Sequence, residues 1–135
     1  MKTMASSGFT LIELMVVVII IAALAGMVLP HVLPASNKAK SSIARGDIAN
    51  ISMALKMYHL HNGKYPAGGA GLEVLMKPDP KFGNAPYLER DAIDPWKNPY
   101  IYKYPGSKGS YGFDIVCTGP DGQEGGDDDV NSWDK

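Results

Sequence analysis

The order of hydrophobic and polar residues divides the chain into three unlike parts. The first is a run of 21 residues, 9–29, that contains one charged residue, Glu13, and no proline. A helix rises about 1.5 Å per residue, so this run spans roughly 31 Å, close to the thickness of the hydrocarbon core of a bilayer. The pattern therefore predicts a membrane-spanning helix over residues 9–29.

The second part, residues 30–62, has the pattern of an amphipathic helix. Its apolar residues recur every three to five positions and are predicted to share one buried face: Ile43, Ile48, Ile51, Leu55 and Tyr58. The sequence His-Asn-Gly at 61–63 tolerates the left-handed backbone that commonly ends a helix. Pro30 and Pro34 each remove a helical hydrogen bond, so we expect a kink or local melting where the two parts of one long helix meet.

The third part, residues 63–135, is rich in glycine and proline but also holds ten of the twelve aromatic residues. Aromatic side chains at this density supply the buried area of a small loop-rich domain, so we predict a folded head. Residues 100–104 and 111–117 flank a turn-prone linker and predict a β-hairpin. A third strand is expected around residues 87–93, and one or two helical turns around 71–76. The predicted fold class is α+β.

Length and composition exclude several classes of function. At 135 residues the chain has the size of one domain, and its formal net charge of −1 argues against a protein that grips nucleic acid. Its single cysteine, Cys117, excludes an internal disulfide. Catalysis is not expected, because no nucleophile motif such as GxSxG is present and the histidines form no constellation: His31, His59 and His61. Asp114 alternates with apolar neighbours and is interpreted as an outward-facing, solvated acid.

Two ordinary interpretations compete for the N-terminal run. It could be a secretory signal peptide, with a cleavage site imitated by the small residues Ala22, Ala23, Ala25 and Gly26, but it is too long for one. A plain single-span anchor is the stronger alternative. Neither explains Glu13, which lies five positions into the segment. An ionisable residue inside a membrane segment is costly, about 3 kcal/mol at the centre, and by default marks a functional site. Glu13 is therefore expected to have a partner.

The start of the chain resembles a known processing site. The sequence Gly-Phe-Thr-Leu-Ile-Glu at 8–13 follows a short polar leader that carries Lys2, as in type IV pilins and the pseudopilins of type II secretion. The resemblance implies that prepilin peptidase cleaves between Gly8 and Phe9, removes a leader of residues 1–8 and methylates the new amino group. It also implies that the carboxylate of Glu13, favoured at a helix N-terminus, neutralises the α-amino group of Phe9 in an adjoining subunit.

The resemblance also sets the expected orientation, with the N-terminus in the cytoplasm. Charge alone favours the opposite orientation, because only Lys2 precedes the span, whereas Lys38, Lys40 and Arg45 follow it. The orientation therefore depends on the processing motif and not on the count of charges.

The C-terminal end concentrates acidic residues beside glycines. Its carboxylates are Asp121, Glu124, Asp127, Asp128 and Asp129. Calcium binds about 6–8 oxygen atoms in a flexible cage, which this composition suits, although the spacing is not that of an EF-hand. The alternative is a solvated acidic tail. Trp133 favours a segment folded back onto the head, since a large aromatic residue is unusual at the end of a disordered tail.

The head also resembles that of the major pseudopilins of type II secretion, through residues 94–100, 119–122, 128–130 and 133. The resemblance covers nearly the whole chain and implies a type IV pilin-like fold. It implies calcium binding by the side chains of Asp121, Asp128 and Asp129 and by backbone carbonyls near Thr118, Gln123 and Gly126. Asp127 makes the register of the aspartates ambiguous by one. Lys97 stands where the family commonly has glycine, so the turn after Trp96 is expected to differ.

The resemblance implies a structural protein of four segments: leader 1–8, transmembrane and filament-core helix 9–29, amphipathic half-helix 30–62 and head 63–135. Copies would form a homopolymeric helical filament that grows from the bacterial inner membrane into the periplasm and drives protein export. The implied partners are minor pseudopilins, prepilin peptidase, and an inner-membrane assembly platform with its ATPase, since the chain has no phosphate-binding loop of its own. Two alternatives remain: a type IV pilus or competence pseudopilus subunit, and a calcium-binding module on a single-span tether, for which Glu13 would be dispensable.

Overall fold

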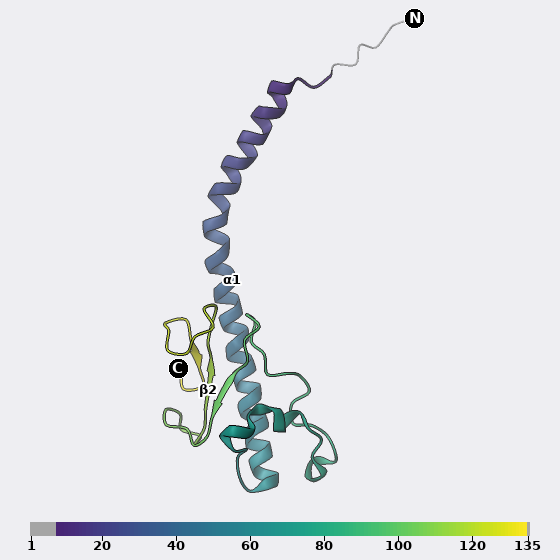
Figure 1. Cartoon of the computed structure of the whole chain (residues 1–135), viewed down its shortest axis with the longest axis vertical. Helices are drawn as coiled ribbons and strands as arrows, with labels where there is room; N and C mark the ends of the chain where they lie inside the picture. The colour runs from purple at the N-terminus through teal and green to yellow at the C-terminus, as the bar shows by residue number, and fades with distance from the viewer. Residues whose placement is uncertain (1–7, 135) are drawn as a thin grey trace, which may run out of the picture. The chain divides into compact units, whose positions relative to one another are not determined.

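A computed structural model describes residues 8–134, without the side chains of residues 28–35. The chain divides into two compact units, Met1–Ser36 and Asn37–Lys135. One helix, α1 (Leu11–Asn62), supplies residues to both units (Figure 1). Its helical assignment is unbroken at Pro30 and Pro34, so the local melting considered for this region is wrong, and the kink stays a prediction.

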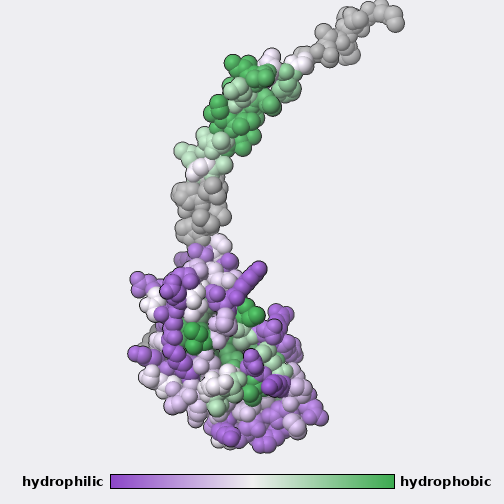
Figure 2. All heavy atoms as spheres, viewed as in Figure 1, coloured by the Kyte–Doolittle hydropathy of each residue, from purple (hydrophilic) through white to green (hydrophobic). Residues whose placement is uncertain are grey.

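The described part of the first unit is an exposed apolar helix. Large side chains from Phe9 to Met27 are all at least 44% exposed, and Figure 2 shows hydrophobic residues gathered there. Within the part of the chain that the structure describes, no helix has the length and apolar character needed to cross a membrane. The membrane-spanning segment over residues 9–29 therefore stays a prediction.

In the second unit, one face of α1 forms half of the core. Its buried residues are Ala44, Ile48, Ile51, Ala54 and Leu55, with Tyr58 packed at the edge. The amphipathic pattern is thus confirmed, except at Ile43, which is 56% exposed. The error has a geometric cause, since a step of five residues from Ile48 turns the helix by about 140° and leaves the buried face. The helix ends as predicted, with the Gly63 N–H donating to the His59 carbonyl at 2.7 Å.

The other half of the core is a three-stranded antiparallel sheet in the order β1-β2-β3. The strands are β1 (Ile101–Lys103), β2 (Asp114–Cys117) and β3 (Val130–Asn131). The β1–β2 pairing confirms the predicted hairpin, and Figure 1 shows the sheet beside the second half of α1. All four residues of the central strand β2 are buried. Side chains that fill the space between sheet and helix include Phe113, Ile115, Tyr102, Leu75 and Val130.

The prediction of a third strand at residues 87–93 is wrong. The third strand is β3, where Val130 pairs with Cys117 and Asn131 with Val116. Residues 87–93 are held by other contacts: the N–H groups of Tyr87 and Leu88 both donate to the Leu75 carbonyl. The backbone donors of Tyr87 and Leu88 are therefore directed at the preceding 3₁₀ turn, and Ile93 forms only an isolated bridge with Pro99.

Along the chain, three short 3₁₀ helices follow α1 and precede the first strand: η1 (Gly68–Ala70), η2 (Leu72–Met76) and η3 (Pro80–Phe82). The second confirms the helical turns predicted at residues 71–76, and it buries Leu72 and Leu75. Two polar contacts fix the head against α1: Tyr100 Oη donates to Asp47 Oδ2 at 3.0 Å, and Trp96 Nε1 to Asn37 Oδ1 at 3.4 Å.

Candidate functional site

The acidic residues lie in one loop that joins β2 to β3, so the solvated-tail interpretation is wrong. Both ends of this loop are in the sheet, and Trp133 is half-buried. The start and end of the loop approach closely at Gly119 (φ 63°), where a Cβ atom would lie 2.6 Å from the Asp128 carbonyl oxygen. Only glycine fits this backbone conformation and this space. The segment is therefore part of the folded head.

Two of the predicted ligands approach the same point of the backbone. A Cβ atom on Gly126 would overlap Asp128 Oδ1 and would lie 3.7 Å from Asp121 Oδ2. The Asp121 N–H donates to Asp128 Oδ2 at 3.3 Å, and Asp121 Oδ1 accepts from the Gln123 N–H at 2.9 Å. The carboxylates of Asp121 and Asp128 thus lie on one side of the loop, beside Gly126.

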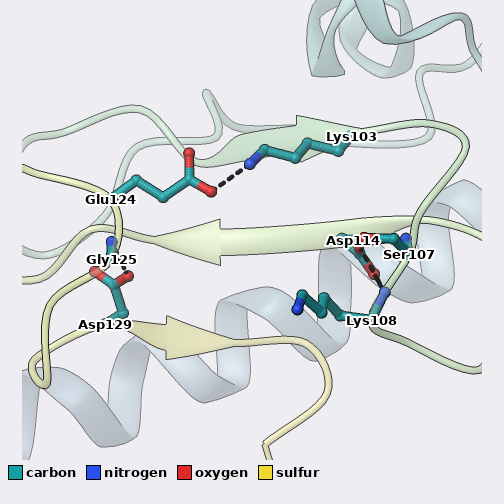
Figure 3. A network of polar contacts seen from close by, with 7 residues as sticks. All are labelled: Lys103, Ser107, Lys108, Asp114, Glu124, Gly125 and Asp129. Carbon is teal, nitrogen blue, oxygen red and sulfur yellow. Dashed lines mark hydrogen bonds and ion pairs between the residues drawn. The ribbon is translucent and has the colours of Figure 1, made fainter.

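The third predicted ligand, Asp129, accepts a hydrogen bond with one of its two carboxylate oxygens. Its Oδ2 accepts from the Gly125 N–H at 2.7 Å (Figure 3). Its Oδ1 is buried, and among the described residues it has no hydrogen-bond partner. A buried carboxylate oxygen without a donor is costly unless a cation or a water molecule satisfies it.

The predicted ligand Thr118 and the alternative acid Asp127 differ in how far they are buried. Thr118 is 4% exposed at the end of β2, whereas Asp127, the residue that made the register ambiguous, is exposed. Across the described residues, no three acidic, histidine or cysteine side chains come close enough together to hold a metal ion. The oxygen donors thus share one loop, and the calcium site stays a prediction.

Contacts from two neighbouring segments hold the acidic loop. Lys103 of β1 forms an ion pair with Glu124, and both side chains are about half exposed (Figure 3). Asn98 Nδ2 donates to the Gly119 carbonyl at 3.1 Å. An exposed ion pair stabilises little, about 0–1 kcal/mol, so the Asn98 contact and the β2–β3 pairing position most of the loop.

Asn98 is itself positioned by a buried acid, Asp94. Asp94 Oδ1 accepts from the N–H groups of Trp96 at 2.9 Å and Asn98 at 2.8 Å. Its Oδ2 accepts from Cys117 Sγ at 3.3 Å, and burial raises the pKa of the Cys117 thiol to about 12. The thiol is therefore a protonated donor. Lys97, in the same turn, has φ 74°, a left-handed conformation that favours glycine.

Asp114 corrects one of the sequence interpretations. It is 2% exposed, and its carboxylate accepts from the N–H groups of Ser107 at 2.7 Å and Lys108 at 3.1 Å (Figure 3). It also accepts from the Gly109 N–H at 2.8 Å. Burial opposes ionisation, but these hydrogen bonds and the charge of Lys103 lower the pKa of Asp114 below its ordinary value. The prediction assumed one solvated face on β2, and β2 is buried along its whole length.

The N-terminal site is an exposed helix start. Gly8, Phe9 and Glu13 are all exposed, and the rest of the predicted leader, residues 1–7, lies outside the described residues. Glu13 occupies the first turn of α1, where the helix dipole favours a carboxylate, and its N–H donates to Thr10 Oγ1 at 3.3 Å. Thr10 thus caps the helix. The Thr-x-x-Glu spacing could have identified this cap from the sequence.

A polar cluster at the end of α1 was not foreseen. Asp79 accepts from Asn62 Nδ2 at 2.7 Å, from Tyr87 Oη at 3.0 Å and from the Lys81 N–H at 2.8 Å. The Asn62 bond, followed by that of Lys81, lowers the pKa of Asp79. His61 Nδ1 lies 3.0 Å from Tyr87 Oη, within hydrogen-bond distance, so His61 also belongs to this cluster. This cluster fixes the 79–87 segment to the helix.

Comparison with known proteins agrees with both parts of the resemblance. Residues 3–29 match the model of the prokaryotic N-terminal methylation motif, and residues 31–133 match that of type II secretion system (T2SS), protein G. The chain is 47% identical to the type II secretion system core protein G of Pseudomonas aeruginosa, over 99% of each chain. It is 39% identical to that of Escherichia coli strain K12, over 93% of this chain and 90% of the relative.

Among solved structures, the chain resembles the crystal structure of the major pseudopilin from the type 2 secretion system of enterohaemorrhagic Escherichia coli. The TM-score is 0.62 at 29% identity, and the match covers 73% of this chain and 86% of that one. Fold and methylation motif together define a pilin-like protein, with a long N-terminal helix packed on a small antiparallel sheet. Within that class, the chain belongs to the type II secretion system protein G family. The predicted family and the α+β pilin-like fold are confirmed.

Proposed function

We propose that the chain is the structural subunit of a periplasmic pseudopilus that is assembled from the bacterial inner membrane and drives export by type II secretion. The observation that supports this most directly is the match of both functional parts, the processing segment at 3–29 and the head at 31–133. The match to protein G favours this function over a type IV pilus or competence pseudopilus. The family is one of structural pseudopilins, in keeping with the expectation that the chain is not an enzyme.

The N-terminal residues have distinct roles in this proposal. Cleavage after Gly8 by prepilin peptidase creates the α-amino group of Phe9, which is then methylated. Each copy then carries a positive amine at Phe9 and a negative carboxylate at Glu13. An isolated charge in apolar surroundings is costly, and pairing with the opposite charge of an adjoining copy reduces that cost. Glu13 thereby favours the polymer over the membrane-stored subunit.

The other partners follow from the chemistry that the chain lacks. The sequence contains no phosphate-binding loop, so polymer growth requires an ATPase that acts through an inner-membrane assembly platform. Minor pseudopilins would complete the filament. A homopolymer of this kind needs a heterologous contact that repeats without closing, which generates a helical filament.

Calcium is the proposed cofactor of the head. Two observations support it: Asp129 Oδ1 is a buried oxygen without a described donor, and Asp121 and Asp128 approach Gly126 together. The three carboxylates are not close enough to hold an ion as described, so binding would draw them together. Hard oxygen ligands of this type are those that calcium prefers. The side chains of Asp121, Asp128 and Asp129 would hold the ion, with carbonyls near Thr118, Gln123 and Gly126. A bound cation supplies positive charge that crosslinks the β2–β3 loop.

Replacing Glu13 by alanine tests the proposed function. In cells with the complete secretion system, Glu13→Ala should retain Gly8 cleavage and membrane association but lose pseudopili and export. Glu73→Ala, which removes an exposed acid of the head, is the matched control and should behave as the unmodified chain. Normal pseudopili from Glu13→Ala chains would contradict the proposed role of Glu13 in assembly. The absence of oligomers of the unmodified chain after cross-linking would instead support a calcium-binding module on a single-span tether.

A further inference from the structure

The side chain of Asn98 lies against the acidic loop at two of its glycines. Its Nδ2 donates to the Gly119 carbonyl at 3.1 Å. Its Oδ1 lies beside Gly122, where a Cβ atom would be 3.4 Å away. Both glycines have a left-handed backbone, with φ 63° at Gly119 and 70° at Gly122. Asn98 therefore spans the short turn of residues 119–122, which carries the proposed ligand Asp121.

Gly119 is also the point where this turn meets the second proposed ligand. A Cβ atom on Gly119 would lie 2.6 Å from the Asp128 carbonyl oxygen and 2.8 Å from Asp128 Oδ2. The Asp121 N–H donates to the same Oδ2 at 3.3 Å. The backbone at Gly119 is thus packed directly on Asp128. A shift of Gly119 would therefore change the position of Asp121 and Asp128 relative to each other.

The position of Asn98 is fixed by Asp94. Two hydrogen bonds join the residues: the Asn98 N–H donates to Asp94 Oδ1 at 2.8 Å, and the Asp94 N–H donates to the Asn98 carbonyl at 2.8 Å. Asp94 is 4% exposed, and a buried carboxylate is stable only where donors surround it. Its donors are the N–H groups of Trp96 and Asn98 and the thiol of Cys117. These bonds hold the backbone of Asn98 beside the acidic loop.

Cys117 connects Asp94 to the strands between which the acidic loop runs. Its thiol donates to Asp94 Oδ2 at 3.3 Å, and the residue is fully buried at the end of β2. In the sheet, Cys117 pairs with Val130 at the far end of the loop. The contacts therefore form a chain, from Cys117 through Asp94 and Asn98 to Gly119. This chain starts at the base of the loop and ends beside its carboxylates.

The proposed ligands have to move to bind an ion. The carboxylates of Asp121, Asp128 and Asp129 are not close enough together, in the part of the chain that the structure describes, to hold a metal ion. Drawing them together restricts the loop, and the entropy lost in that step lowers the affinity for calcium. A loop whose turn is already fixed loses less entropy when it binds. The contacts of Asn98 supply such a fixed turn.

We propose that Asn98 is a positioning residue for calcium: it holds Gly119, and thereby the carboxylates around it, in place for an ion that it does not itself touch. This inference rests on calcium as the proposed cofactor of the head. Asp94 and Cys117 take part because they hold Asn98. Removing a residue that only stabilises the head would lower its melting temperature and leave the calcium affinity of the folded protein unchanged. Removing a positioning residue also lowers that affinity.

The test is a titration of the purified full-length chain, in detergent, with calcium chloride, followed by calorimetry. Asn98→Ala should raise the Kd for calcium about tenfold, which corresponds to about 1.4 kcal/mol and to the net free energy of one hydrogen bond. Asn62→Ala is the matched control, because the amide it removes donates to Asp79 and Tyr87 and not to the acidic loop. The control should keep the Kd of the unmodified chain, although both variants should melt at a lower temperature in calcium-free buffer.

Hydrogen exchange of the calcium-free chain gives a second readout. Asn98→Ala should speed exchange of the N–H groups of residues 119–125, because their turn is no longer held, and should leave residues 79–87 unchanged. Asn62→Ala should have the reverse effect.

Two substitutions test the contribution of the thiol. Cys117→Ser keeps a donor for Asp94 and should keep the Kd for calcium. Cys117→Ala removes the donor and should raise the Kd about threefold, the equivalent of a weak net hydrogen bond. Equal Kd values for the two variants would exclude the thiol from this role.

Three results would overturn the inference: an unchanged Kd for Asn98→Ala, an equal rise in Kd for Asn98→Ala and Asn62→Ala, or unchanged exchange at residues 119–125 in Asn98→Ala. Each of them leaves calcium standing as the proposed cofactor if the unmodified chain binds it. If the unmodified chain binds no calcium, the proposed cofactor itself fails, and the inference fails with it.

Discussion

Asp114 provides the sharpest test of how the head is stabilised. Its buried carboxylate accepts three backbone hydrogen bonds from residues 107–109. Asp114→Ala removes both acceptor oxygens and with them all three hydrogen bonds. The residues that donate are largely exposed, so water can satisfy the freed N–H groups and the loss is that of the net hydrogen bonds, about 1 kcal/mol each and about 3 kcal/mol in total. For a domain of about 100 residues this corresponds to a fall in melting temperature of roughly 12 °C or more.

The assay is thermal unfolding of the purified chain in detergent, followed by near-ultraviolet circular dichroism of the head's aromatic residues. Asp91→Ala, which removes an exposed acid of the same head, is the control and should change stability by less than about 0.5 kcal/mol. A loss below about 1 kcal/mol for Asp114→Ala would refute the reasoning, because each of the three hydrogen bonds would then contribute less than the usual net value of about 0.5–1.5 kcal/mol.

The same substitution has a pH signature. The pKa of Asp114 is lowered in the folded head, so its ionised form stabilises the fold above the unfolded-state pKa of about 3.9. That contribution is lost as the pH falls through the lower, folded-state pKa. The unmodified chain should therefore lose stability toward acid more steeply than Asp114→Ala. Equal acid sensitivity of the two proteins would contradict the assigned shift.

Three further predictions concern the turn, the acidic loop and the end of α1. Lys97→Gly should stabilise the head by about 1 kcal/mol, measured by thermal unfolding, because Lys97 holds a left-handed φ of 74°; destabilisation would contradict this. Saturating calcium should stabilise the head by about 3 kcal/mol at 100 times Kd. Asp128→Ala should abolish that gain and Asp127→Ala should not, and equal effects would reject the assigned register. Asn62→Ala should raise the pKa of Asp79, measured by carbon NMR titration, and an unchanged pKa would exclude Asn62 as its main cause.

The sequence predicted the elements whose signals are local. The helix end at residues 61–63, the β1–β2 hairpin and the helical turns at 71–76 each depend on residues that are neighbours in the chain. The processing motif at 8–13 is equally local. Apolar spacing identified most of the buried face of α1 and failed only at Ile43, where the pattern was extended by a step of five.

The errors arise where distant segments decide the outcome. β3 is two residues long and pairs with β2 across the acidic loop, so its strand character comes from Cys117 and Val116 and not from its own composition. Asp114 alternates with apolar neighbours in the sequence, which predicted a solvated side chain. It is buried because residues 107–109 fold over it. The polar cluster of Asp79, Asn62 and Tyr87 likewise joins residues far apart in the chain.

The most direct test of the proposed pseudopilus is a cryo-electron microscopy structure of filaments isolated from cells that produce the unmodified chain. We expect a helical array of this chain in which residues 1–8 are absent, the Phe9 amine is methylated and it faces Glu13 of an adjoining copy. Filaments in which Glu13 faces solvent or lipid, or filaments that do not contain this chain, would contradict the account.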